Sequence, residues 1–169
     1  MDPAFITPFI KSVQNVFNMM LQLDVTVEDP RLKTDAKATY DVSGIIGLSG
    51  DVVGSAVLSF PTDAAERIVA LFTGEELSVE HPDFADAIGE LINMVTGNAK
   101  ADFAGRNVSI SCPNVVRGKD HTIARPREIP TVLIPCTTDC GELMLEISLQ
   151  DASSNAAAAG SAAGAANAA

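Results

Sequence analysis

The chain has few basic residues and no long apolar run. Eleven Lys and Arg stand against 22 Asp and Glu, a formal net charge of −11 over 169 residues. This balance disfavours nucleic-acid binding, because neutralising phosphates takes clustered Lys and Arg. It also disfavours binding to an anionic membrane surface. No run reaches the roughly 18 apolar residues that span a bilayer, and the N-terminus lacks the basic region of a signal peptide. We therefore expect a globular protein of the cytoplasm.

Several signatures of chemistry are also missing. An odd count of three cysteines argues against a disulfide framework. The chain has no Gly-rich phosphate loop of the Walker type and no local signature of Ser/His/Asp catalysis. Cys112, His121, Cys136 and Cys140 leave a Cys₃His zinc site open, but without the usual knuckle spacing. Small structural thiols are the favoured interpretation of these cysteines.

Composition divides the chain near residue 150. Residues 151–169 are mostly Ala, Gly, Ser and Asn, with no bulky apolar side chain after Leu149. Such a segment can bury almost nothing, so we expect a disordered tail. Residues 1–150 are long enough for one hydrophobic core and are predicted to form a single domain.

Apolar residues at helical spacing predict three helices, at about 7–22, 63–72 and 83–103. Thr7 suits the cap of the first helix and Pro8 its first helical position. Gly74 is placed to end the second helix.

Turn residues and alternating patterns predict the strands. We expect four long strands at 39–48, 52–60, 131–137 and 142–150, and short ones near Val25 and Val108. In the last long strand the apolar set is Leu143, Leu145, Ile147 and Leu149, and the opposite set is Glu142, Met144, Glu146 and Ser148. This alternation predicts one packed face and one polar face.

A helix followed by a hairpin occurs twice. Residues 9–20 align with residues 84–95, with identities at Phe9/Phe84, Asn18/Asn93 and Met19/Met94. The alignment indicates a pseudo-repeat with halves at about 7–60 and 83–150. The second half carries extra residues at 113–130, interpreted as a flexible basic loop with Arg117, Lys119, Arg125 and Arg127. The repeat predicts an α/β (α+β) fold, a mostly antiparallel sheet with two long pseudo-symmetric helices on one face.

The outward face of the third helix carries the candidate site. At about 100° per residue, Asp86, Glu90, Asn93, Gly97 and Lys100 share an arc opposite the apolar residues. Glu90 and Asn93 are three apart and therefore neighbours on the helix surface. One interpretation is an ordinary solvated face. The other is a docking face, whose carboxylate attracts a Lys ammonium and whose carboxamide holds and aims a water molecule.

Two glycines favour the second interpretation. Gly97 follows Asn93 by about one turn, and Gly89 adjoins Glu90. Each mid-helix Gly costs about 1 kcal/mol relative to Ala. Their presence suggests either that another backbone approaches the helix closely or that the helix merely tolerates them.

Residues 86–100 read Asp-Ala-Ile-Gly-Glu-Leu-Ile-Asn-Met-Val-Thr-Gly-Asn-Ala-Lys. This segment resembles the signature helix of the CheC/CheX/FliY phosphatases, which act on phosphorylated CheY in bacterial chemotaxis. The Glu-x-x-Asn spacing, the preceding Gly and the later Gly-Asn-x-Lys match, and the resemblance extends over about residues 5–150. Two-site members carry Glu-x-x-Asn on both pseudo-symmetric helices. Here Asn15 aligns with Glu90, so the chain resembles the one-site, CheX-type members.

The resemblance implies a phosphatase for the aspartyl phosphate of a CheY-like receiver. Glu90 would pair with the receiver's active-site Lys, and Asn93 would orient the attacking water, a scheme in which positioning supplies most of the catalysis. Asp86, Gly89, Gly97 and Lys100 would contact the partner. The Mg²⁺ would belong to the receiver, so we expect no metal or cofactor bound by this chain.

The resemblance also implies a homodimer and leaves an alternative function open. CheX relatives form homodimers through sheet strands, and open sheet edges make such pairing reasonable. The alternative function is a non-catalytic adaptor of the same fold that binds a receiver or a flagellar-switch component. Intact Glu90 and Asn93 favour the phosphatase.

Overall fold

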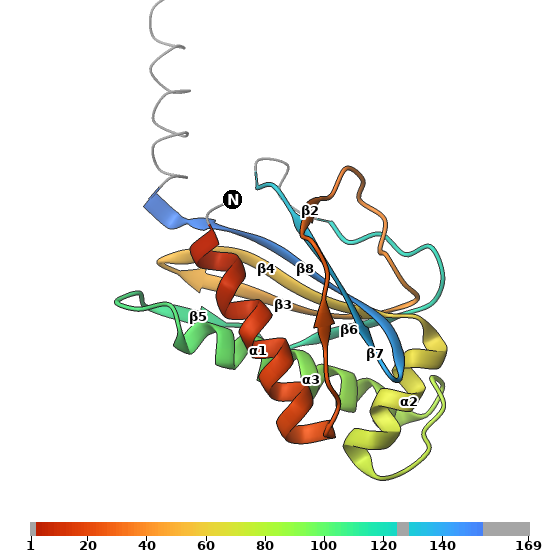
Figure 1. Cartoon of the computed structure of the whole chain (residues 1–169). Coiled ribbons are helices and arrows are strands. Elements are labelled where there is room, and N and C mark those ends of the chain that lie inside the picture. Colours follow the sequence, from red (N-terminus) through yellow and green to blue (C-terminus); the bar gives the residue numbers. More distant parts are fainter. Residues whose placement is uncertain (1–2, 125–128, 154–169) are drawn as a thin grey trace, which may run out of the picture.

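A computed structural model describes residues 3–124 and 129–153 of the chain (Figure 1). Its helices are α1 (Pro3–Leu21), α2 (Thr62–Thr73) and α3 (Pro82–Ala101). Its strands are β1 (Thr26–Val27), β2 (Arg31–Leu32), β3 (Val42–Gly50), β4 (Val52–Phe60), β5 (Val108–Ile110), β6 (Asn114–Arg117), β7 (Val132–Thr138) and β8 (Gly141–Asp151). None of the helices in these ranges has the length and apolar character that crossing a membrane requires.

The strands form one antiparallel sheet in the order β1-β7-β8-β4-β3-β5, with β2 also paired to β7 and β6 to β3. Helices α1 and α3 lie together against one face of this sheet (Figure 1). The Ser12 hydroxyl of α1 donates a hydrogen bond of 2.6 Å to the Val95 carbonyl of α3. The predicted fold class is therefore confirmed.

The same order of elements occurs twice along the chain. A long helix, two short strands and a hairpin appear as α1-β1-β2-β3-β4 and again as α3-β5-β6-β7-β8, joined by α2. The short strands of each half pair with the hairpin of the other half, so the two halves are tied together. The domain bounds 1–150 and 151–169 stay a prediction, as does the homodimer. Most of the predicted tail, residues 154–169, lies outside the described residues.

Helix α1 begins earlier than its sequence predicts. It starts at Pro3 rather than near Thr7, and Pro8 lies inside it. Pro8 removes one backbone donor, which ordinarily disfavours an interior position. The opposing effect is burial of Phe5, which is 3% exposed and packs edge-on against Phe103 with ring centroids 6.0 Å apart. Packing of this aromatic pair favours the additional helical turn.

Strand β6 contradicts part of the predicted basic loop. Asn114–Arg117 pair with β3, from Val42↔Arg117 to Ile45↔Asn114. The apolar run in this segment is only Val115-Val116, too short for a sequence pattern to mark a strand. Strand β2 was missed for the same reason. Two of the basic residues predicted in the loop, Arg125 and Arg127, lie outside the described residues.

The sheet face opposite the helices is covered, which the alternation in β8 does not predict. Leu143, Leu145, Ile147 and Leu149 are buried as expected, but Met144, Glu146 and Ser148 are buried as well. The segment between β2 and β3 lies over this second face. Its Lys33 ammonium is 3.4 Å from the Glu146 carboxylate, with side chains 5% and 0% exposed. Thr39 also donates a hydrogen bond of 3.0 Å to Glu146.

We predict that Lys33→Met destabilises the fold by about 3 kcal/mol, because it removes a cationic partner from a buried carboxylate. The matched control is Lys37→Met. Lys37 pairs with Asp120 at 3.7 Å, but both side chains are exposed, so the expected loss is below about 1 kcal/mol. Urea unfolding of both variants measures the difference. Equal losses would contradict a structural role for the buried pair.

The single tyrosine provides a pH-dependent prediction. Burial, followed by the 2.9 Å hydrogen bond that Tyr40 donates to Glu142, raises the pKa of Tyr40 from 10.0 to about 12. Between these pH values the unfolded chain releases a proton that the folded protein keeps, so the free energy of unfolding falls as pH rises. Tyrosinate absorbance should titrate near pH 12 in the folded protein and earlier in Glu142→Gln. A midpoint near 10 in the parent protein would refute the prediction.

Candidate functional site

Helix α3 holds the candidate residues in a fixed orientation. His81 caps its N-terminus, accepting a hydrogen bond of 3.2 Å at Nδ1 from the Asp83 N–H, and Pro82 is the first helical residue. The inner face is completely buried and consists of Phe84, Ile88, Leu91, Ile92, Val95 and Ala99. Because this face cannot turn away from the core, the opposite arc must face outward.

The outward arc contains the predicted site residues. Asp86 and Glu90 are exposed, whereas Asn93, Gly97 and Lys100 are half-buried. Within the described part of the chain, Asp86, Glu90 and Asn93 have no side-chain hydrogen bond or ion pair. The carboxylates and the carboxamide are therefore available to a partner molecule.

A groove runs beside Glu90 between α3 and β6. Four helix residues form one wall and two residues at β6 form the other, with a volume of about 410 Å³. The lining residues are Ala85, Asp86, Gly89 and Glu90, facing Pro113 and Val115. We call this feature the α3–β6 groove. Pro113 and Val115 were missed by the sequence analysis, because their segment was interpreted as a loop.

Gly89 explains how the two walls can lie so close. It is buried, and a Cβ at this position would lie 3.3 Å from Pro113 Cγ and 3.7 Å from Val115 Cγ2. The close neighbours at Gly89 are therefore side chains of the same chain, and not the backbone that the sequence suggested. The absence of a side chain at Gly89 thus lets Pro113 and Val115 lie close to α3.

Gly97 has a different environment. Apart from the backbone of α3 itself, no atom of the described residues lies within 4 Å of where its Cβ would be. Asn93, Gly97 and Lys100 do not line the α3–β6 groove, since they lie farther along the helix toward its C-terminus. Because Gly97 has no side chain, the half-buried helix surface one turn from Asn93 is bare.

The equivalent region of α1 is arranged differently. A depression of about 350 Å³ is lined by Gln14, Asn15, Asn18, Met19, Asp24 and Val25. In the sequence alignment Asn15 corresponds to Glu90, so α1 has no carboxylate at that position. The Asn18 amide donates a hydrogen bond of 3.0 Å to Asp24, and that donor is thus already engaged. The sequence shows that α1 lacks the carboxylate of α3. The structure adds that the Asn18 amide already has a partner.

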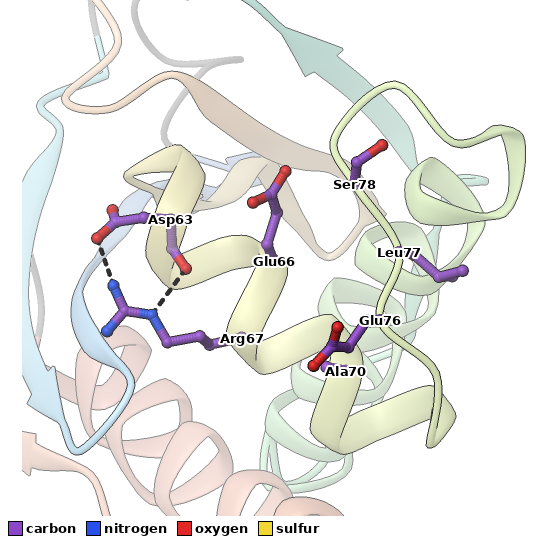
Figure 2. A pocket seen from close by; sticks show the side chains of 7 residues that line it. All are labelled: Asp63, Glu66, Arg67, Ala70, Glu76, Leu77 and Ser78. Atoms are coloured by element: carbon purple, nitrogen blue, oxygen red, sulfur yellow. Dashed lines mark hydrogen bonds and ion pairs between the residues drawn. The ribbon is translucent and has the colours of Figure 1, made fainter.

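The cavity beside α2 is a second candidate, which Figure 2 shows from close by. Its volume is about 450 Å³, but three of its polar side chains already have partners within the chain. Arg67 turns toward Asp63, whose carbonyl accepts a 3.1 Å hydrogen bond from Arg67 Nε and whose carboxylate pairs with the guanidinium (Figure 2). Glu66 accepts a 2.8 Å hydrogen bond from the Val79 N–H. We therefore place the candidate site on α3.

The zinc alternative has no geometric support. Among the described residues, no three His, Cys, Asp or Glu side chains gather in a way that could hold a metal ion. Cys136 lies in the core, and burial raises the pKa of its thiol to about 12. A thiol that resists deprotonation is a poor metal ligand. Cys112 is exposed, and Cys140 lies in the β7–β8 turn.

Comparison with known proteins relates this geometry to one family. The family model described as "Chemotaxis phosphatase CheX" matches residues 42–137. A curated relative, "CheY-P phosphatase CheX" of Thermotoga maritima, is 29% identical over 123 residues, covering 71% of this chain and 79% of the relative. The crystal structure of the chemotaxis protein CheX from Desulfovibrio desulfuricans is similar with a TM-score of 0.80 and 30% identity, covering 86% of this chain and 99% of that one.

A more distant structure shares the fold. It is the CheX–CheY–BeF₃–Mg²⁺ complex from Borrelia burgdorferi, whose matched chain has a TM-score of 0.69 at 20% identity and covers 87% of this chain and 98% of its own.

The two helix glycines yield a stability prediction. Gly97→Ala should stabilise the protein by about 0.5–1 kcal/mol, since Ala favours helix and the new methyl meets nothing. Gly89→Ala should gain less, because its methyl presses on Pro113. Thermal unfolding should show the larger rise in Tm, about 2–4 °C, for Gly97→Ala. A rise that is equal or larger for Gly89→Ala would contradict the close contact.

Proposed function

The chain belongs to the CheX family of chemotaxis phosphatases, and from this premise we propose that it hydrolyses the aspartyl phosphate of a CheY-like receiver with Glu90 and Asn93. The observation that carries the proposal is the presentation of both side chains on the outward arc of a helix whose inner face is buried. Relatives named for CheY-P hydrolysis and for a CheY complex support the choice of substrate.

Asn93 is proposed to orient the attacking water. Its carboxamide has both a donor and an acceptor, and neither is used within the described chain. Phosphoryl transfer depends mainly on positioning and electrostatics, so a correctly aimed water needs no covalent enzyme intermediate. Asn93 is half-buried on a rigid helix, which limits the rotamers that the side chain samples. A rigid support of this kind is what water positioning requires.

Glu90 is proposed to dock the receiver. Its exposed carboxylate would pair with the lysine of the receiver's phosphorylation site and so set the depth to which α3 inserts. The bare surface at Gly97 would let the receiver backbone approach the helix next to Asn93. Lys100 would lie at the rim of the contact. The receiver's own carboxylates would hold Mg²⁺, which supplies charge neutralisation at the phosphoryl group.

We predict that Asn93→Ala lowers the rate of receiver dephosphorylation by at least about 100-fold, because the water loses its positioning group. Binding of the receiver should persist. The receiver is phosphorylated with a small phosphodonor and Mg²⁺, the donor is removed, and phosphate release is followed with each variant. The matched control is Asn15→Ala, an exposed Asn on α1, which should behave like the parent.

Two results would redirect the proposal. If Asn93→Ala releases phosphate as fast as the parent, the assigned role is wrong. If the parent binds the phosphorylated receiver without accelerating its decay, the protein is an adaptor of the CheX fold rather than a phosphatase.

A further inference from the structure

We propose that the α3–β6 groove receives a second basic side chain of the receiver, and that Asp86 and Val115 thereby determine which receivers dock. The inference rests on the proposed function and deepens it, since it concerns the choice of partner. Glu90 is already assigned to the lysine at the phosphorylation site. The groove begins at Glu90 and extends to Ala85 and Asp86, away from Asn93, which is not part of its lining. It can therefore hold a different side chain.

The walls of the groove differ in chemistry. The helix wall presents two carboxylates, Asp86 and Glu90, neither of which has a cationic partner within the described residues. The opposite wall, Pro113 and Val115, is apolar and half-buried. A long basic side chain matches both walls, because it combines an aliphatic stem with a charged head. The stem would lie against Pro113 and Val115, and the head would lie at Asp86.

The surrounding charge favours the same occupant. Between Glu75 and Glu90 the sequence contains six acidic residues and no Lys or Arg. A surface of one sign raises the rate at which a partner of the opposite sign associates and discourages acidic partners. A receiver that bears a basic residue beside its phosphorylation site would meet this surface favourably.

The groove is also fixed in width. The two walls are already close at Gly89, where an added Cβ would lie 3.3 Å from Pro113 Cγ, and β6 is held in the sheet by its pairing with β3. A preformed groove orders few groups on binding, so more of the contact energy appears as affinity. A preformed shape also excludes side chains of the wrong length, which is a property expected of a specificity determinant.

The experiment compares Asp86→Asn with Glu75→Gln. Both changes remove one exposed carboxylate from the same acidic stretch, but Glu75 lies outside the groove. Binding is measured with the CheY of the same cell loaded with BeF₃⁻ and Mg²⁺. Turnover of the phosphorylated receiver is measured in parallel. Asp86→Asn should raise both Kd and KM about fivefold at low salt, with kcat unchanged, whereas Glu75→Gln should leave all three near the parent values.

A second variant tests the apolar wall. Val115→Thr keeps the shape of the side chain but adds a hydroxyl, and it should raise Kd about two- to threefold without changing kcat. Raised salt should reduce the effect of Asp86→Asn and leave that of Val115→Thr, since only the former is electrostatic.

Three outcomes would overturn the inference. They are equal effects of Asp86→Asn and Glu75→Gln, a fall in kcat for Asp86→Asn, or no change in Kd for either groove variant. In each of these cases the parent still hydrolyses the phosphorylated receiver. Failure of the proposed function would appear instead in the parent protein, as absent hydrolysis or absent binding.

Discussion

Burial of one complete face of α3 is the constraint on which the candidate site depends. The inner residues of this helix are fully buried, and consecutive helix positions differ by about 100°. A rotation by one residue would expose core side chains and move Glu90 and Asn93 out of position together. The hydrophobic core, with the neighbouring helix α1 and the sheet, thus determines where a carboxylate and a carboxamide point. The packing of the core therefore determines the geometry of the candidate site.

Sequence patterns predicted the elements whose signals are local. The apolar spacing of 84–95 indicated α3, and the alternation of 143–149 indicated β8, because both periods repeat over several turns or pairs. Burial of the polar face of β8 could not be predicted in this way. Glu146 is covered because Lys33, far away in the sequence, lies over it. Contacts of this separation depend on the sheet order, which no local period contains.

The residues of the candidate site also differ in whether a local sequence pattern could indicate them. Glu90 and Asn93 were found from one helix face, since their relation is a spacing of three residues. Pro113 and Val115 were missed because only the pairing of β6 with β3 brings them to the helix. On α1, the sequence alignment places Asn15 at the position of Glu90. The hydrogen bond from Asn18 to Asp24, which engages the amide there, is a tertiary feature that became visible only in the structure.

The two glycines of α3 both lower the stability of the helix, but they differ in the packing around them. Both lower helix stability by about 1 kcal/mol relative to Ala. A Cβ at Gly89 would lie 3.3 Å from Pro113 Cγ, so close packing accompanies the cost there. Among the described residues, nothing outside the helix lies within 4 Å of a Cβ at Gly97, so packing does not explain that glycine. Positions that break a local rule without an internal gain are expected where a partner binds. Gly97 lies one turn from Asn93, on the side away from the α3–β6 groove. The two proposed site residues therefore have different surroundings, since Glu90 lines the α3–β6 groove and Asn93 lies between that groove and Gly97.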